Sequence, residues 1–350
     1  MPSLTDRTGA HSILENAVPR RALLDSWLTS ALRGQSYTLH PASSDASFRR
    51  YFRAHLDDGT SRIVMDAPSE QEDCTPWLSI AKLFGAAGIH VPEVYAADVQ
   101  HGFILMSDLG DTTYLQALKV DNAAHLYADA LGSLIAIQAA SAPGVLPEYS
   151  RELLEREMLL FDEWYIVRHH GTQLDDATRD MLQKIRTKVL ASNLAEPQVF
   201  VHRDYHSRNL MYLSGQNAPG IIDFQDAVYG PISYDLVSLL KDAYIKWDEA
   251  FELDMLIRYW ETARQVGLPV REDFSDFHHD YDWMGVQRHL KVLGIFARLA
   301  HRDGKTAYLA DMPVVLEHLR RVCERYGELR PLLRLLDRLE PRETVEGYTF

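Results

Sequence analysis

Residues 199–226 carry the feature that most constrains the fold of this 350-residue chain. Two short apolar segments, 199–201 and 210–213, enclose a polar run, and an apolar pair at 221–222 leads directly to Asp223. This pattern is typical of short buried strands that display a polar loop between them. The fold must therefore bring a polar loop and Asp223 to the ends of neighbouring strands.

The polar residues in this region are the types that Mg²⁺-dependent phosphoryl transfer requires. That reaction needs a carboxylate near the acceptor hydroxyl, together with oxygen ligands for a hard cation. Asp204 can supply the catalytic carboxylate, and Asn209 and Asp223 can supply the metal ligands. His202 can hold the loop through hydrogen bonds to the backbone. The region therefore predicts a catalytic site.

The rest of the chain divides into a β-rich part and a helical part. An expected lead-in over residues 1–18 and an amphipathic helix ending near Gly34 precede a hairpin around Gly59, because an Asp-Gly turn between strand-like runs is a strong hairpin signal. A helix and two more strands complete an α+β unit over residues 1–108. The remainder, 109–350, is expected to be mainly helical, with long helical patterns at 114–140, 150–169, 175–193 and 233–339. The expected fold class is α+β, with a small β-containing N-lobe and a larger helical C-lobe.

Composition and charge restrict the partners of the chain. Acidic residues outnumber basic ones by 50 to 36, a net charge of −14, whereas nucleic-acid binders usually carry a basic surface. The longest apolar stretches fall short of a membrane span, and the first 20 residues lack the apolar core of a signal peptide. Cys74 and Cys323 form no metal or disulfide pattern. We expect a cytoplasmic protein with no nucleic-acid, membrane or protein partner.

The spacing His202-x-Asp204-x₄-Asn209, followed by Ile222-Asp223-Phe224, resembles the catalytic and metal-binding segments of the aminoglycoside phosphotransferase/choline kinase family. This resemblance implies a two-lobed protein-kinase-like fold, with ATP and Mg²⁺ as cofactors and a small molecule as acceptor. Only a dozen residues separate Asp223 from Asp235, which leaves no room for the activation segment of a protein kinase. Protein substrates are therefore not expected.

The resemblance extends along the chain from about residue 20. Residues 43–53 resemble the loop that covers the phosphates, and residues 104–110 resemble the hinge, where the backbone of Met106 to Asp108 would meet adenine. Residues 230–236 resemble a family segment in which Asp235 is the buried organiser. Three runs, 65–68, 108–111 and 284–299, are most similar to bacterial anomeric kinases of N-acetylmuramate and N-acetylglucosamine, which serve peptidoglycan recycling.

One position departs from the family pattern. Met65 occupies the strand position where kinase-like proteins carry a lysine that reaches the phosphates, and a thioether cannot supply that charge. Arg49, Arg50 and Arg53 are the nearest cations. Strand alternation places Arg49 and Arg53 on one face and Arg50 on the other. We therefore predict that one of these three arginines contacts the ATP phosphates.

Three residues are weaker candidates for sugar contacts. Arg288 could bind a lactyl carboxylate through paired hydrogen bonds, and Trp283 and Glu163 could bind an amino sugar. Trp283 lies at helical spacing from Val286 and Leu290, which is also the pattern of a core residue.

Three alternatives to an amino-sugar kinase remain open from the sequence. An aminoglycoside or another amino-alcohol is the second acceptor class, because an acidic chain attracts cations. A metallohydrolase could use the alternating set His202, Asp204 and His206, with His169-His170 or His278-His279 as further ligands. The loss of the strand lysine also permits a non-catalytic nucleotide-binding protein.

Overall fold

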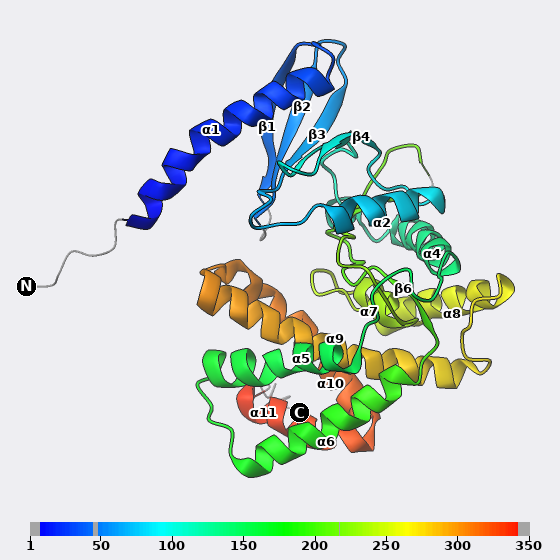
Figure 1. Ribbon diagram of the computed structural model, residues 1–350. Helices are drawn as coiled ribbons and strands as arrows, with labels where there is room; N and C mark the ends of the chain where they lie inside the picture. Colours follow the sequence, from blue (N-terminus) through cyan, green and yellow to red (C-terminus); the bar gives the residue numbers. More distant parts are fainter. Residues whose placement is uncertain (1–7, 45–47, 217, 342–350) are drawn as a thin grey trace, which may run out of the picture. The chain divides into compact units, whose positions relative to one another are not determined.

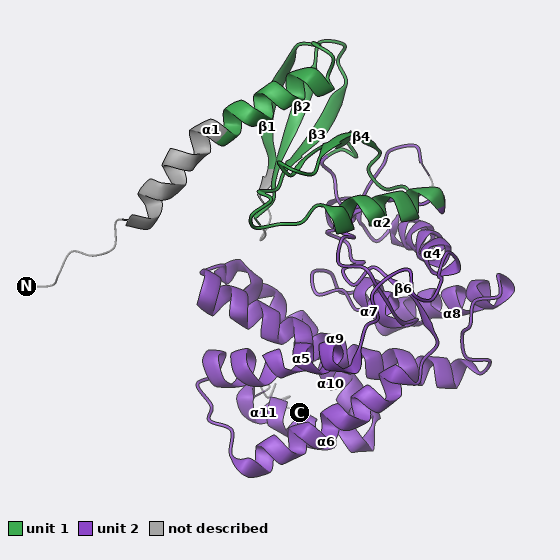
Figure 2. Ribbon diagram, viewed as in Figure 1, with its two compact units in different colours: residues 1–86, 90–110 green, residues 87–89, 111–350 purple. Residues whose placement is uncertain are grey.

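The structure, a computed structural model, describes residues 8–44, 48–216 and 218–341. The chain separates into two compact units, one of residues 1–86 and 90–110 and the other of residues 87–89 and 111–350 (Figure 2). The predicted lead-in lies partly outside the described residues, which begin at residue 8. The centre of the predicted phosphate-covering loop, residues 45–47, also lies outside them.

Unit 1 is built on a five-stranded antiparallel sheet in the order β1-β2-β3-β5-β4. Helix α1 packs on one face of the sheet, where Leu24, Leu28 and Leu32 join the apolar side chains of β2, β3 and β5. Burial of these side chains is the main stabilising contribution to the unit. Its elements are α1 (Thr8–Ala31), β1 (Tyr37–Ser44), β2 (Arg50–Leu56), β3 (Ser61–Asp66), α2 (Thr75–Ala86), β4 (Val94–Asp98) and β5 (Phe103–Ser107).

Two glycines lie in tight turns next to the ends of strands in this sheet. Gly59 has a φ of 82° in the turn between β2 and β3, so the hairpin predicted at this site is confirmed. Gly102, with a φ of 73°, precedes β5, and a Cβ atom there would lie 1.7 Å from the carbonyl oxygen of Ala67. Only glycine fits this close approach between two backbone segments.

Unit 2 is mostly helical (Figure 1) and is organised around α9 (Phe274–Asp303), whose side chains are buried along most of its length. Helix α9 contacts α5, η1, α6, α7 and α10. The other helices are α3 (Tyr114–Ala117), α4 (Ala123–Ala139), α5 (Arg151–Leu160), η1 (Phe161–His169), α6 (Asp176–Leu194), α7 (Tyr234–Leu240), α8 (Glu249–Gln265), η2 (Thr306–Asp311), α10 (Met312–Arg325), η3 (Gly327–Leu329) and α11 (Arg330–Leu339).

Two small antiparallel sheets in unit 2 present the polar loop. Strand β6 (Gln198–Val201) pairs with β9 (Val228–Pro231), and β7 (Leu210–Met211) pairs with β8 (Gly220–Ile221). The polar loop therefore begins where β6 ends and returns to β7. Asp223 follows β8 after one residue, as the apolar pattern of the sequence predicted.

Several elements differ from the sequence expectations. Helix α1 begins at Thr8, so the predicted lead-in is wrong for residues 8–18, which are helical. Strand β1 was not predicted as a strand, and neither was β9. The helix predicted over residues 114–140 is two helices, α3 and α4, because the chain turns between them at Leu118 to Asn122.

The helix predicted over residues 150–169 changes its hydrogen-bond pattern halfway. It is α-helical through α5 and becomes a π-helix in η1, where the N–H of His170 still bonds the carbonyl of Tyr165 at 3.2 Å. Helix α9 passes very close to this junction, since a Cβ atom on Gly294 would lie 2.4 Å from the backbone of Leu160. Wide π turns of this kind are rare and often occur near functional sites.

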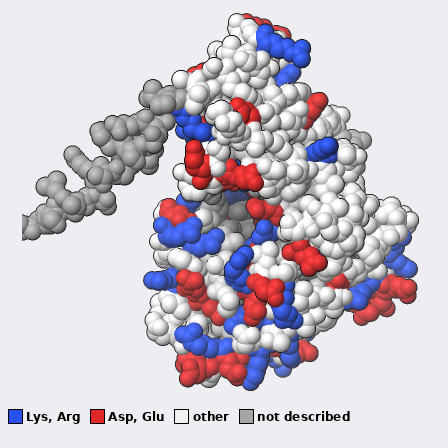
Figure 3. All heavy atoms as spheres, in the orientation of Figure 1, with Lys and Arg blue, Asp and Glu red and all other residues white. Residues whose placement is uncertain are grey.

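On the face drawn in Figure 3, acidic and basic side chains are interspersed over unit 2. Within the described residues, no helix has both the length and the apolar character needed to span a bilayer. Cys74 and Cys323 are buried free thiols.

Candidate active site

One buried carboxylate holds the start of the polar loop between β6 and β7. Asp235, in the first turn of α7, accepts hydrogen bonds from the backbone N–H groups of His202 (2.6 Å) and Arg203 (3.0 Å). These bonds hold Arg203 in a left-handed conformation with a φ of 77°. Such a conformation costs free energy and persists only where neighbouring contacts enforce it. Burial raises the pKa of Asp235 to about 7, against the effect of the two backbone bonds.

His202 joins the loop to the segment after β8. Its Nε2 atom lies 3.0 Å from the carbonyl oxygen of Ile222, and its Nδ1 atom accepts the backbone N–H of Asp204 at 3.3 Å. Burial lowers the pKa of His202 to about 4, so the ring is neutral at pH 7 and Nε2 carries the proton. The hydrogen bonds predicted for His202 from the sequence are therefore present.

Asn209 lies between the loop and Asp223. Its amide Nδ2 donates to the backbone oxygen of Asp204 (3.0 Å) and to Oδ2 of Asp223 (3.3 Å). Gln225 donates to the other carboxylate oxygen of Asp223 at 2.8 Å, and Asp223 itself has a φ of 64°. The structure thus brings Asp204, Asn209 and Asp223 together, as the sequence predicted.

The carboxyl group of Asp204 lies in a cationic environment. Burial alone would raise its pKa, but the positive charges of Lys291 and Arg288 outweigh that effect and lower the pKa to about 2. Both cations belong to α9, and Arg288 also donates to the backbone oxygen of Arg203 at 3.1 Å. Asp204 is therefore a carboxylate throughout the neutral pH range.

The cations beside Asp204 are balanced by a buried glutamate. Glu157 of α5 forms ion pairs with Arg203 (2.6 Å) and Lys291 (3.0 Å), and the hydroxyl of Tyr149 donates a short hydrogen bond to its carboxylate. Lys291 also donates to the hydroxyl of Tyr234 at 2.9 Å. A buried cation without such partners would be costly, so Glu157 makes this arrangement possible.

Three arginines of unit 1 are candidates for contacting the ATP phosphates, and each of them has an acidic partner. Arg49 bonds Glu72 at 2.5 Å, Arg50 bonds Asp66 at 2.5 Å, and Arg53 bonds Asp108 at 2.6 Å. The sequence did not predict these pairs.

The three arginines do not all lie on the same face of the sheet. Asp66, the partner of Arg50, also binds Arg20 of α1 at 2.6 Å, so Arg50 belongs to the face that α1 covers. Arg49 and Arg53 belong to the other face by alternation along the chain. Met65 lies on β3 opposite Tyr51 and is fully buried.

The predicted hinge residues lie at the end of β5 and in the turn that follows. Met106 is buried in β5, opposite Ile63 of β3. The carboxylate of Asp108 accepts bonds from Arg53, from the hydroxyl of Ser61 (2.7 Å) and from the N–H of Gly110 (2.9 Å). Burial would raise the pKa of Asp108, but these bonds lower it overall. The side chain of Asp108 thus stabilises the turn.

The geometry agrees with a comparison of the sequence with protein families. Residues 38–272 match the phosphotransferase enzyme family (APH), and this span includes the sheet, the polar loop and Asp223. The chain belongs to the phosphotransferase enzyme family.

Relatives of this phosphotransferase match it over nearly its whole length. The N-acetylmuramate/N-acetylglucosamine kinase of Neisseria meningitidis serogroup B is 49% identical over 336 residues, which cover 95% of this chain and 99% of that protein. The kinase of the same name from Pseudomonas aeruginosa is 50% identical over 298 residues, covering 85% of this chain and 87% of the relative.

Solved structures confirm the two-lobed kinase-like α+β fold of the phosphotransferase. Choline kinase LicA from Streptococcus pneumoniae superposes with a TM-score of 0.62 at 12% identity, covering 85% of this chain and 98% of that one. The ADP-bound aminoglycoside phosphotransferase APH(2'')-Ib gives a TM-score of 0.57 at 15% identity, covering 85% and 97% of the two chains. At such low identity these likenesses establish the fold alone.

The three weaker sugar candidates lie in different surroundings of the phosphotransferase. Arg288 is buried beside the polar loop, where it donates to Arg203. Trp283 is buried against the rings of His279 and Tyr326. Glu163 is exposed on η1. Among the described residues, no recorded contact joins Trp283 or Glu163 to Asp204.

The geometry does not favour the metallohydrolase alternative. Residues 202–206 form a loop instead of a strand, and both ring nitrogens of His202 already serve the backbone. In the part of the chain that the structure describes, the histidine and carboxylate cluster that could hold a metal is a different one, considered below.

Sequence reasoning missed the supporting residues Glu157 and Lys291. The available signal was a lysine three residues after Arg288 within a long apolar run, since a buried cation there requires a buried acid nearby. The partner lies 134 positions away in sequence, on α5, and no local pattern identifies it.

Proposed function

We propose that this phosphotransferase transfers the γ-phosphoryl group of ATP to the anomeric C1 hydroxyl of N-acetylmuramate and N-acetylglucosamine. The observation that carries the proposal is the 49% identity, over 95% of this chain, to a kinase named for these two sugars. Its product would enter the recycling of cell-wall amino sugars. Because the reaction consumes ATP, we place the enzyme in the cytoplasm.

Asp204 is the group that we propose to receive the proton of the acceptor hydroxyl. The hydroxyl oxygen bonds to the γ-phosphorus as the bond from that phosphorus to the bridging oxygen of ADP breaks. As a carboxylate at neutral pH, Asp204 can both orient the hydroxyl and receive its proton. Orientation suits a loose transition state, in which positioning and charge provide most of the catalysis.

Asn209 and Asp223 are the residues that we propose to hold Mg²⁺. The donor set fits this ion, because Mg²⁺ prefers oxygen ligands and these side chains offer an amide oxygen and a carboxylate. The two side chains adjoin, since Nδ2 of Asn209 donates to Oδ2 of Asp223 at 3.3 Å. When bound, Mg²⁺ would offset the negative charge of the ATP phosphates. Gln225 and Asn209 keep the carboxylate of Asp223 in one orientation.

The hinge segment offers its backbone for adenine in this proposal. The side chain of Asp108 is engaged by Arg53, Ser61 and Gly110, so contacts from Met106 to Asp108 with the base would be made by main-chain groups. Arg288 is assigned a role behind the polar loop, because its guanidinium is buried and donates to Arg203. Trp283 and Glu163 remain proposed sugar contacts.

We propose that Arg49, paired with Glu72, takes the place of the usual strand lysine and its glutamate. Kinase-like enzymes hold the phosphate-binding lysine through an ion pair to a helix glutamate, and Glu72 lies just before α2. Arginine can contact two phosphate oxygens at once. Arg50 lies on the α1 face and Arg53 is bound to the hinge, so neither matches this arrangement as well.

Replacing Arg49 by alanine is expected to raise the KM for ATP about tenfold or more and to lower kcat, since a charged hydrogen bond contributes roughly 1.5–3 kcal/mol. Steady-state kinetics with ATP as the varied substrate measure this effect. Arg50→Ala is the matched control and should stay close to wild type. An Arg49→Ala enzyme with unchanged ATP saturation, or a larger loss in Arg50→Ala, would show that the assignment is wrong.

Replacing Lys291 by methionine is expected to raise the pKa of Asp204, because the carboxylate loses a neighbouring positive charge. Below that pKa Asp204 is protonated and cannot accept a proton, so kcat/KM should fall on the acid side. An opposite charge shifts a carboxyl pKa by roughly 1–3 units, so the acid limb should appear between about pH 3 and 5. Lys246→Met, at a half-exposed lysine, is the control. Identical profiles in both variants would contradict the electrostatic role.

An acceptor panel tests the proposed function. The purified enzyme would be supplied with Mg²⁺ and ATP, and ADP release measured with N-acetylmuramate, N-acetylglucosamine, an aminoglycoside and choline in turn. We expect kcat/KM for the two amino sugars to exceed that for the other acceptors by several orders of magnitude. A preference for the aminoglycoside or choline would replace the proposal with the corresponding kinase activity.

A further inference from the structure

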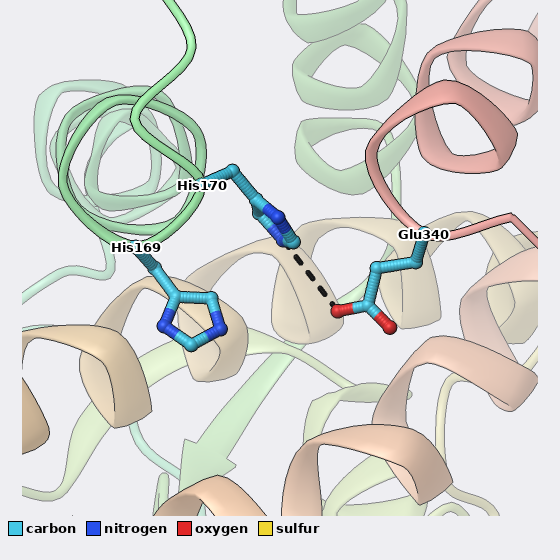
Figure 4. Close-up of side chains that lie close together, drawn as sticks. All are labelled: His169, His170 and Glu340. Carbon is cyan, nitrogen blue, oxygen red and sulfur yellow. Dashed lines mark ion pairs between the residues drawn. The ribbon is translucent and has the colours of Figure 1, made fainter.

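A group of metal-ligating side chains lies in unit 2, on elements other than those that carry the polar loop. His169 ends η1, His170 follows it, and Glu340 follows the last residue of α11 (Figure 4). One ligand atom from each residue can be chosen so that all three lie within 4.8 Å of one another. Within the group, Nε2 of His170 lies 3.5 Å from Oε1 of Glu340.

A third histidine adjoins the group. Nε2 of His301, in the last turn of α9, lies 3.0 Å from Nδ1 of His169. His301 is exposed, whereas His169 and His170 are half-buried. Three imidazoles and one carboxylate are the ligand types that zinc binds in proteins. The residues come from three separate helices, so their convergence is a product of the tertiary fold.

The neighbouring residues orient these side chains. The hydroxyl of Tyr165 donates to Oε1 of Glu340 at 2.9 Å, and Arg320 donates a short hydrogen bond to the Glu340 backbone oxygen. Outer hydrogen bonds of this kind commonly fix the ligands of metal sites. In its neutral form each imidazole offers one nitrogen lone pair to a metal.

We propose that His169, His170 and Glu340 bind a zinc ion, with His301 available as a fourth ligand. Ligand atoms around a tetrahedral zinc ion lie roughly 3.3 Å apart, given zinc–nitrogen bonds of about 2.0–2.1 Å. The His170–Glu340 pair is already near that separation, and all three ligand atoms lie within 4.8 Å of one another. The ion would join η1, α9 and the end of α11, and its role would be structural.

Zinc titration of the full-length enzyme tests the proposal directly. The protein, freed of any affinity tag and dialysed against a chelator, is titrated with zinc chloride in a calorimeter and melted with and without zinc. We expect one equivalent to bind and Tm to rise by about 4–6 °C at a hundredfold excess over Kd. Kinase activity should be retained, because the site contains none of the proposed catalytic residues.

Variants assign the binding to these residues. His170→Ala and Glu340→Gln should each weaken zinc binding at least about tenfold, and His125→Ala, at an exposed histidine on α4, should bind like wild type. If the variants fold poorly, cobalt binding to the wild-type protein gives a second test, since tetrahedral cobalt has a distinctive visible spectrum. Absence of zinc binding by the wild type, or binding that both ligand variants retain unchanged, would overturn the proposal.

Discussion

Replacing Asp204 by asparagine is expected to lower kcat by about 10²–10⁴-fold, the usual scale for the loss of a positioned proton acceptor. The amide has nearly the same shape but cannot accept the proton of the sugar hydroxyl. The loop should keep its conformation, because its backbone is held by Asp235, His202 and Asn209, none of which depends on the Asp204 carboxylate. Steady-state kinetics with N-acetylmuramate give the measurement.

Two controls accompany the Asp204 variant. Circular dichroism and ATP binding should match the wild-type enzyme, which separates a catalytic effect from unfolding. Asp254→Asn, at an exposed aspartate on α8, removes a carboxylate without touching the loop and should leave kcat unchanged. An Asp204→Asn enzyme that turns over sugar at the wild-type rate would show that another group receives the proton.

Replacing Asp223 by alanine is expected to abolish Mg²⁺-dependent turnover, with a loss on the order of 10³-fold or more. Asp223 is the only carboxylate in the proposed ligand pair, and Asn209 alone offers a neutral oxygen. A titration of activity against Mg²⁺ concentration provides the readout. Excess Mg²⁺ should not restore the rate, because the lost ligand carries the charge.

The Asp223 variant also distinguishes the metal site from the fold. Asp223 lies in a left-handed conformation, so its replacement by alanine can affect the local backbone as well as the ligand. Asp223→Asn keeps the shape and a tolerance for this conformation, and it should lose most of the activity too. An Mg²⁺ dependence that neither substitution alters would place the metal at other residues.

The polar loop was predictable because its information is local. Short apolar runs set the strands on either side of residues 202–209, and the spacing of Asp204, Asn209 and Asp223 led to the proposed chemistry. The structure places these three residues together through Asn209. The hairpin at Gly59 was predictable for the same reason, since a turn is encoded in adjacent residues.

The supporting interactions were not predictable, because they join distant segments. Nothing near Lys291 in the sequence indicates Glu157, and nothing near Arg49 identifies Glu72 over Glu70. The π-helical turn after α5 begins where α9 passes close to Leu160 at Gly294, and only the packed structure shows this approach. Long-range packing therefore determined the features that sequence patterns left open.

The position of the phosphate on the sugar tests the central claim most directly. N-acetylmuramate labelled with ¹³C at C1 would be converted with Mg²⁺ and ATP, and the product examined by phosphorus and carbon NMR. We predict a single phosphate whose phosphorus couples to the labelled C1, and no reaction with the sugar alcohol, which lacks an anomeric hydroxyl. A phosphate on another carbon, or phosphorylation of the sugar alcohol, would contradict the account.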